Sequence, residues 1–326
     1  MKAETGKDIE KAKGLLESGQ LVSIPTETVY GLAGNALHIE SLISIYKVKK
    51  RPSFDPLIVH ISSFDMIGKY VKSVPEIFYK LAEKFSPGPI TYVLPKRDII
   101  PDLVTSGYET VAIRIPNHPF TLELLSSLSF PLAAPSANLF GQISPTSPHH
   151  VFEQLGAFIP YILDGGICAI GLESTIVTVF DDKLKILRHG GISLENLQKV
   201  AGKDIIHSHE NDLITVPGQL KSHYATRTQM LIGDIPTLIK KFAGHKLAVL
   251  SFKTHFNEIS PDYQIVLSPS GNIDHAAQEL FSAMHNLDRL NADFILTELF
   301  PEESLGIAIN DRLKRASFRD YFSESL

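Results

Sequence analysis

The sequence predicts two α/β domains, a mixed one followed by a smaller parallel one. Short β-branched segments alternate with helical patterns up to residue 206, polar and irregular sequence covers residues 207–228, and strand and helix patterns resume from residue 229. A chain of 326 residues is also longer than one hydrophobic core usually serves. We therefore predict domains at residues 1–206 and 229–326, joined by a linker at residues 207–228.

The first domain begins with an amphipathic helical pattern at residues 8–16, followed by an apolar strand at residues 21–24 that runs into Pro25. The other expected strands are residues 90–94, 111–115, 161–163, 175–180 and 184–187. Helical patterns cover residues 39–48, 75–85, 119–128 and 194–200. The strand order cannot be read from these patterns, so the domain is predicted only as mixed α/β.

The second domain has expected buried strands at residues 246–252, 264–267 and 294–299. Between the last two, apolar residues recur at helical spacing from Ile273 to Leu290, and Asn272 is a suitable N-cap. Strands that alternate with helices favour a small parallel sheet.

Composition limits the function classes. Hydrophobic residues make up 44% of the chain, which is typical of a globular protein. The net charge of −5 does not favour a broad nucleic-acid clamp, so no stable nucleic-acid binding is expected. The single cysteine, Cys168, allows no intrachain disulfide, the first residues are polar and charged, and no apolar run could span a bilayer. We expect a cytoplasmic protein without a membrane partner.

Two stretches near the start carry residues suited to ligand chemistry. In residues 23–34 a strand ends at Pro25, and hydroxyl residues including Thr28 precede several glycines. Such a turn can approach a ligand closely, although it is equally consistent with a simple turn in which Thr caps a helix. In residues 47–60, Lys49 and Arg51 lie in a basic turn stiffened by prolines, which suits phosphate, although cations at a helix end also suit its dipole. His60 alone is more typical of a partly buried residue than of a functional one.

Two later stretches add hydroxyl, amide and guanidinium groups. The loop at residues 134–146 carries Ser136 and Asn138, which can bind phosphate and ribose or their own backbone. Gly-rich loops at residues 164–173 and 189–191 flank strands near Ser174 and Arg188. Arg114 is a charge inside an apolar strand and needs a carboxylate, either structural or from a ligand. The Walker phosphate loop, G-x-G-x-x-G, G-x-S-x-G and H-E-x-x-H are all absent.

Together these stretches resemble the YrdC-like family of threonylcarbamoyl-AMP synthases. The matching segments are PTETVYGLAG, the basic run at residues 49–60, FSPGPIT, APSAN with SPT, and GLESTIV, which span residues 24–191. PGQLKSHYA at residues 217–225 is similar to the linker of the two-domain members. The resemblance implies a twisted mixed sheet with a concave basic cavity and a smaller Rossmann-like second domain.

The resemblance also implies site residues. L-threonine would be held by Thr28, His60, Arg114 and Ser174. ATP would be held by Lys49, Arg51, Asp55, Thr110, Ser136, Asn138, Ser144, Arg188 and Tyr224. Asp55 departs from the Asn that is usual in the family, and an acid near phosphates is unfavourable unless it binds a metal or points away. His189 and Thr226 stand where Pro is common.

The implied reaction joins L-threonine, bicarbonate and ATP to give threonylcarbamoyl-AMP and pyrophosphate, without a catalytic nucleophile from the protein. Mg²⁺ is expected with ATP, and the product is expected to pass to a tRNA threonylcarbamoyl-transferase complex. The linker, with Tyr224 near the nucleotide, is expected to act as a lid. Two alternatives stay open, a non-catalytic RNA-binding module of the same fold and a carbamoyltransferase that uses carbamoyl phosphate.

Overall fold

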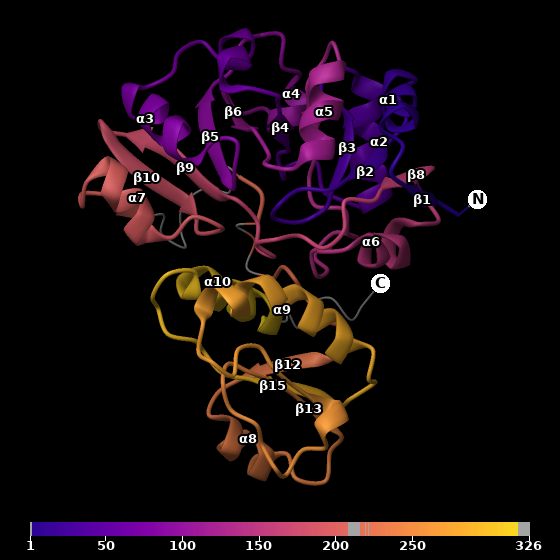
Figure 1. Ribbon diagram of the computed structural model, residues 1–326, viewed down its shortest axis with the longest axis vertical. Helices are drawn as coiled ribbons and strands as arrows, with labels where there is room; N and C mark the ends of the chain where they lie inside the picture. Colours follow the sequence, from indigo (N-terminus) through magenta and orange to yellow (C-terminus); the bar gives the residue numbers. More distant parts are fainter. Residues whose placement is uncertain (1, 208–215, 219, 221, 319–326) are drawn as a thin grey trace. The chain divides into compact units, whose positions relative to one another are not determined.

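The computed structural model describes residues 2–207, 216–218, 220 and 222–318. Figure 1 traces the chain, which divides into two compact units that are described separately. The first unit comprises Met1–Phe140 and Pro145–Gln219, and the second comprises Gly141–Ser144 and Leu220–Leu326. The expected linker at residues 207–228 extends across this division, and its residues 208–215, 219 and 221 lie outside the described part.

In the described part of the first unit, eleven strands form one mixed sheet in the order β1-β8-β2-β3-β7-β4-β6-β5-β9-β10-β11. The strands are β1 (Glu4–Gly6), β2 (Val22–Ile24), β3 (Gly31–Asn35), β4 (Ile58–His60), β5 (Ile90–Pro95), β6 (Thr110–Arg114), β7 (Leu132–Ala133), β8 (Tyr161–Leu163), β9 (Thr175–Phe180), β10 (Lys183–Arg188) and β11 (Ile206–His207). β4 runs parallel to β6, whereas β5 runs antiparallel to it. The prediction of a mixed α/β domain is confirmed.

Helices connect these strands. They are α1 (Ile9–Glu17), α2 (Ile39–Lys49), the 3₁₀ helix η1 (Phe64–Lys69), α3 (Glu76–Phe85), α4 (Asp102–Thr105), α5 (Pro119–Ser127), α6 (Pro148–Leu155) and α7 (Leu194–Ala201). The helices predicted in this region are confirmed to within a few residues, while α4 and α6 were not foreseen. Asp8 starts α1, because its side chain accepts a hydrogen bond from Lys11 N. Figure 1 shows α3 and α7 beside the part of the sheet that carries β9 and β10.

The prediction of a turn through residues 23–34 is wrong for its second half, because Gly31–Asn35 forms β3, antiparallel to β2. Glycine weakens strands in general, but here it allows close packing. A Cβ at Gly34 would lie 2.8 Å from Leu21 Cδ2 and 3.3 Å from Ile45 Cδ1. The turn itself is therefore confined to the residues between β2 and β3.

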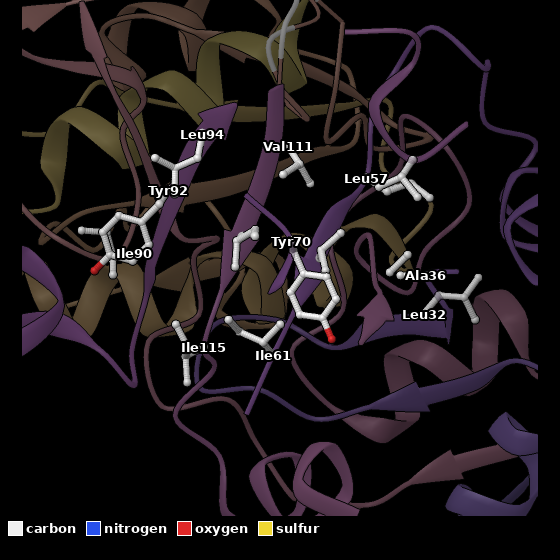
Figure 2. Packing of buried hydrophobic residues seen from close by; sticks show 14 of the residues in the cluster. Leu32, Ala36, Leu57, Ile61, Tyr70, Ile90, Tyr92, Leu94, Val111 and Ile115 are labelled. Carbon is white, nitrogen blue, oxygen red and sulfur yellow. The ribbon is translucent and has the colours of Figure 1, made fainter. Parts of the chain in front are cut away.

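The main core of the first unit lies on one face of the large sheet. Figure 2 shows Ile90, Tyr92 and Leu94 projecting from β5 on the same side, as alternate residues of a strand do. Val111 and Ile115 join them in the same buried cluster. The intervening residues of these strands consequently point to the opposite face.

The second unit contains a four-stranded parallel sheet, among its described residues, in the order β12-β15-β13-β14. Its elements are β12 (Gln229–Ile232), α8 (Ile235–Lys241), β13 (Leu247–Ser251), the 3₁₀ helix η2 (Pro261–Tyr263), β14 (Gln264–Val266), α9 (Ile273–Asp288), β15 (Phe294–Thr297) and α10 (Gly306–Ser317). Figure 1 shows α9 and α10 on one face of this sheet and α8 on the other. The predicted small parallel α/β domain is confirmed, as is the N-cap Asn272, which accepts from His275 N. Across the described residues, no helix has the length and apolar character that crossing a membrane requires.

Candidate functional site

Polar side chains gather on the face of the large sheet opposite the main core. His60, Arg114 and Thr91 occupy paired positions on β4, β6 and β5, so they form a row across three strands. Their neighbours along each strand belong to the main core, so these three side chains point to the other face. Ser174, just before β9, extends the row, because its Oγ lies 2.7 Å from Thr91 Oγ1.

Arg114 is held by acceptors from two loops. Its Nη2 donates to Glu27 Oε1 and to Thr28 Oγ1, each at 2.8 Å, and its Nε donates to Gly88 O at 3.4 Å. Both members of the ion pair are buried, with 4% of Arg114 and 7% of Glu27 exposed. The sequence left open whether Arg114 pairs with a structural carboxylate or a ligand carboxylate, and the structure provides a structural one.

The hydroxyl of Thr28 belongs to a hydrogen-bond chain with a fixed direction. Thr26 Oγ1 donates its single proton to Val29 O at 2.6 Å, so in its 2.7 Å contact with Thr28 Oγ1 it accepts. Thr28 therefore donates to Thr26 and accepts from Arg114. Its hydroxyl orders the arginine and has no proton left for a ligand.

His60 is a neutral base at ordinary pH. Burial, and secondly the charge of Arg114, lower the pKa of His60 to about 3. Its Nδ1 lies 3.2 Å from Ile58 O, within hydrogen-bonding distance. An uncharged imidazole beside Arg114 can take part in hydrogen bonds without adding to the positive charge of the row.

Arg51 and Asp55 form a buried ion pair in the basic turn. Arg51 Nη2 lies 2.7 Å from Asp55 Oδ1, and the guanidinium also donates to the carbonyls of Asp55 and Pro56 at 2.9 and 2.8 Å. Burial raises the pKa of Asp55, while the charges of Arg51, Lys49 and Arg188 oppose this rise. The acid that departs from the family pattern thus lies near three basic side chains and points to Arg51.

Lys49 links the end of α2 to the loop that follows β7. Its Nζ donates to Ser136 O and to Asn138 O, both at 2.5 Å. Burial lowers the pKa of Lys49 well below its usual range. Lys49, Ser136 and Asn138, all predicted to bind ATP, therefore lie together. Lys49 holds the loop through the backbone carbonyls of the other two residues.

Arg188 connects the residues predicted to bind ATP with those predicted to bind L-threonine. Its Nη2 donates to Ser174 O at 2.9 Å and to Ser174 Oγ at 3.2 Å, and its Nη1 donates to Pro217 O at 3.0 Å. Beside Pro217, the buried Val216 packs with Ile58, in a cluster on the same sheet face. This part of the expected linker thus belongs to the first unit.

The remaining predicted residues are less closely grouped. Thr110 begins β6 and lies four residues from Arg114 on the same face, a separation of about 13 Å along a strand. Ser144 and Tyr224 belong to the second unit. There Ser144 O lies 3.2 Å from His285 Nε2, and the buried Tyr224 adopts a left-handed backbone conformation with φ of 63°.

Sequence reasoning missed Glu27 and Thr91. Both lie inside segments that carry the family resemblance, but their contacts with Arg114 and Ser174 join positions 87 and 83 residues apart. An acid between two threonines, within a turn of hydroxyl residues, was the only local signal for Glu27. Among the described residues, no group of three or more His, Cys, Asp or Glu side chains could hold a metal ion.

A cavity of about 400 Å³ lies in the second unit, away from any predicted site residue. The apolar and aromatic residues Leu247, Ile259 and Tyr263 line it, together with the charged residues Lys246 and Glu258.

The fold and this row of side chains define a two-domain α/β protein with a polar, arginine-containing site on the second face of its large sheet. A family profile described as Telomere recombination matches residues 14–190, and a profile described as Threonylcarbamoyl-AMP synthase, C-terminal domain, matches residues 192–317. The chain belongs to this Sua5–YrdC family, in its two-domain form.

Relatives cover almost the whole chain. Threonylcarbamoyl-AMP synthase from Pyrococcus abyssi is 38% identical over 95% of this chain and 94% of its own length. The Bacillus subtilis protein of the same name is 38% identical over 95% and 92%. A crystal structure of P. abyssi Sua5 complexed with L-threonine superimposes with a TM-score of 0.90, at 36% identity over 97% of this chain and 98% of that one. E. coli YciO shares only the fold, with 20% identity and a TM-score of 0.52 over 58% of this chain and 96% of its own.

Proposed function

We propose that this chain is a threonylcarbamoyl-AMP synthase, which makes threonylcarbamoyl-AMP and pyrophosphate from L-threonine, bicarbonate and ATP. The observation that carries the proposal is the row of His60, Arg114, Thr91 and Ser174 on one sheet face, in a chain similar over its full length to synthases of that name. The complex of the P. abyssi relative with L-threonine supports threonine as the amino acid.

In this proposal, Arg114 binds the carboxylate of L-threonine. Its Nη1 makes no hydrogen bond within the described residues, whereas Nη2 and Nε are occupied, so the two N–H groups of Nη1 are left for a ligand. Ser174 and the neutral His60 supply hydrogen-bonding groups nearby, and Thr28 orients Arg114. Such a set suits a small zwitterion with a hydroxyl group.

For ATP, the proposal uses the cluster of Lys49, Arg51 and Arg188 around Asp55. The two guanidinium groups against one carboxylate already give a net positive charge that attracts a polyphosphate. Ser136 and Asn138 lie on the loop that Lys49 holds, while Thr110, Ser144 and Tyr224 are proposed as further ATP contacts. Mg²⁺ is proposed to enter with ATP, held by phosphate oxygens and water, while Asp55 pairs with Arg51 through Oδ1.

The chemistry has two steps. The ammonium group of threonine combines with bicarbonate to give the N-carboxylate, with loss of water and a proton. A carboxylate oxygen of this intermediate then attacks the α-phosphorus of ATP, a P–O bond forms, and the bond to the β,γ-phosphates breaks to release pyrophosphate. The attacking oxygen belongs to the substrate, so the protein contributes position and charge neutralisation.

The product is proposed to pass to a tRNA threonylcarbamoyl-transferase complex, and the protein is proposed to act in the cytoplasm. The linker is proposed as a lid that excludes water from the unstable N-carboxylate. Tyr224→Ala tests the lid, because a normal rate of adenylate formation in that variant would contradict it.

The deciding assay for the activity is pyrophosphate release from ATP. We expect release that depends on both L-threonine and bicarbonate. Release without either one, or none at all with purified full-length protein, would contradict the proposal.

A further inference from the structure

Glu27 lies at the junction of three loops of the first unit. Its Oε1 accepts from Arg114 Nη2 at 2.8 Å, and its Oε2 accepts from Asn117 N at 2.9 Å. Its backbone carbonyl accepts from Ile170 N at 2.8 Å. The carboxylate thus fixes Arg114 from the loop after β2 and ties that loop to the one after β6.

Three acceptors decide which nitrogen of Arg114 is left for a ligand. Glu27 and Thr28 share Nη2, and Gly88 O takes Nε. In the described part of the chain, Nη1 has no hydrogen-bond partner. It is also not among the fully buried polar atoms, so it remains accessible to a ligand. An arginine side chain has several rotatable bonds, and a carboxylate that holds one end of the guanidinium reduces the freedom lost when a ligand binds the other.

We propose that Glu27 is a positioning residue for the amino-acid substrate, acting through Arg114 and not by contact with the substrate. The inference rests on the proposed function, since it takes the carboxylate of L-threonine as the ligand of Arg114. Glu27 holds the guanidinium in one orientation and leaves Nη1 for the ligand, within the row that also carries His60 and Ser174. Without it the guanidinium can turn, and a threonine carboxylate loses its fixed partner.

Glu27→Gln is the discriminating variant, because both carboxylate oxygens of Glu27 accept hydrogen bonds from N–H donors. A glutamine has one oxygen and one NH₂ group, so in either orientation a donor faces a donor. The side chain keeps its size, so the packing of the loop is disturbed as little as possible.

The experiment is calorimetric titration of the full-length protein with L-threonine and, separately, with ATP. We expect Glu27→Gln to weaken L-threonine binding about ten- to one hundred-fold, the range for loss of a charged hydrogen bond. ATP binding is expected to stay within about two-fold. Asp102→Asn is the control, because it removes an exposed carboxylate that pairs with Lys96 and not with Arg114. That variant is expected to bind both ligands normally.

A double-mutant cycle separates positioning from a general structural effect. If Glu27 acts through Arg114, then Glu27→Gln adds no further loss of L-threonine binding in an Arg114→Leu background. Equal losses for both ligands, additive losses in the cycle, or unchanged L-threonine affinity would each overturn the inference. Should Glu27→Gln fail to fold, Glu27→Asp keeps the charge while withdrawing it by one methylene, and the same selective loss is expected.

The proposed activity is tested separately by pyrophosphate release from the unaltered chain. If the unaltered chain binds L-threonine but releases no pyrophosphate, the proposed reaction is excluded, whereas the role of Glu27 in L-threonine binding still holds.

Discussion

Replacing Arg51 with Ala is expected to affect both stability and ATP binding. The side chain is 3% exposed and its partner Asp55 is fully buried, so the variant leaves a carboxylate without its ion-pair partner. Removing one member of a buried pair costs about 3–5 kcal/mol. Because the charges of Lys49 and Arg188 also act on Asp55, we expect the lower end, about 3 kcal/mol.

The measurement is chemical unfolding followed by far-UV circular dichroism, since the chain has no Trp for fluorescence. A second variant, Arg51→Ala with Asp55→Asn, removes the unpaired charge and is expected to recover at least half of the loss. Lys80→Ala removes an exposed pair with Glu76 and is expected to cost less than about 0.5 kcal/mol. The reasoning is refuted if Arg51→Ala unfolds like the unaltered protein, or if the double variant recovers nothing.

The ATP-binding effect of the same variant tests the nucleotide site. Loss of one charged contact to phosphate is expected to weaken ATP binding by about 1.5–3 kcal/mol. Unchanged ATP affinity in a folded Arg51→Ala variant would exclude Arg51 from the site.

Three further predictions follow from buried groups. Because the pKa of His60 is lowered to about 3, only the unfolded chain protonates this imidazole as the pH falls below about 6.5. The free energy of unfolding therefore decreases on acidification by up to about 1.4 kcal/mol per pH unit. His60→Gln should show a flatter dependence of this free energy on pH. Burial raises the pKa of the Cys168 thiol, so a thiol reagent at mildly alkaline pH should leave the folded chain unlabelled and react on unfolding; rapid labelling of the native protein would contradict this. Val216→Ala should destabilise the protein by about 2 kcal/mol, measured as a shift in unfolding midpoint, and no shift would show that this part of the linker does not stabilise the sheet face.

Local patterns in the sequence were sufficient for most helices and for the nature of both sheets. Apolar periodicity and an N-cap at Asn272 predicted α9, and alternation of strand and helix predicted the parallel sheet of the second unit. These features depend on residues close together in the chain. The prediction was wrong for Gly31–Asn35, because Gly34, a residue type typical of turns, is required there by close packing against Leu21 and Ile45.

The motif residues of the candidate site were identifiable from the sequence through their resemblance to a family, but their partners were not. Only strand register puts His60, Arg114 and Thr91 in one row, because strand order joins β4, β6 and β5, which are far apart in the chain. Only the tertiary structure pairs Arg114 with Glu27 and surrounds Asp55 with cations. A charged residue in an apolar strand indicates that it has a partner of opposite charge. The identity of that partner is decided by contacts between segments that are distant in the chain.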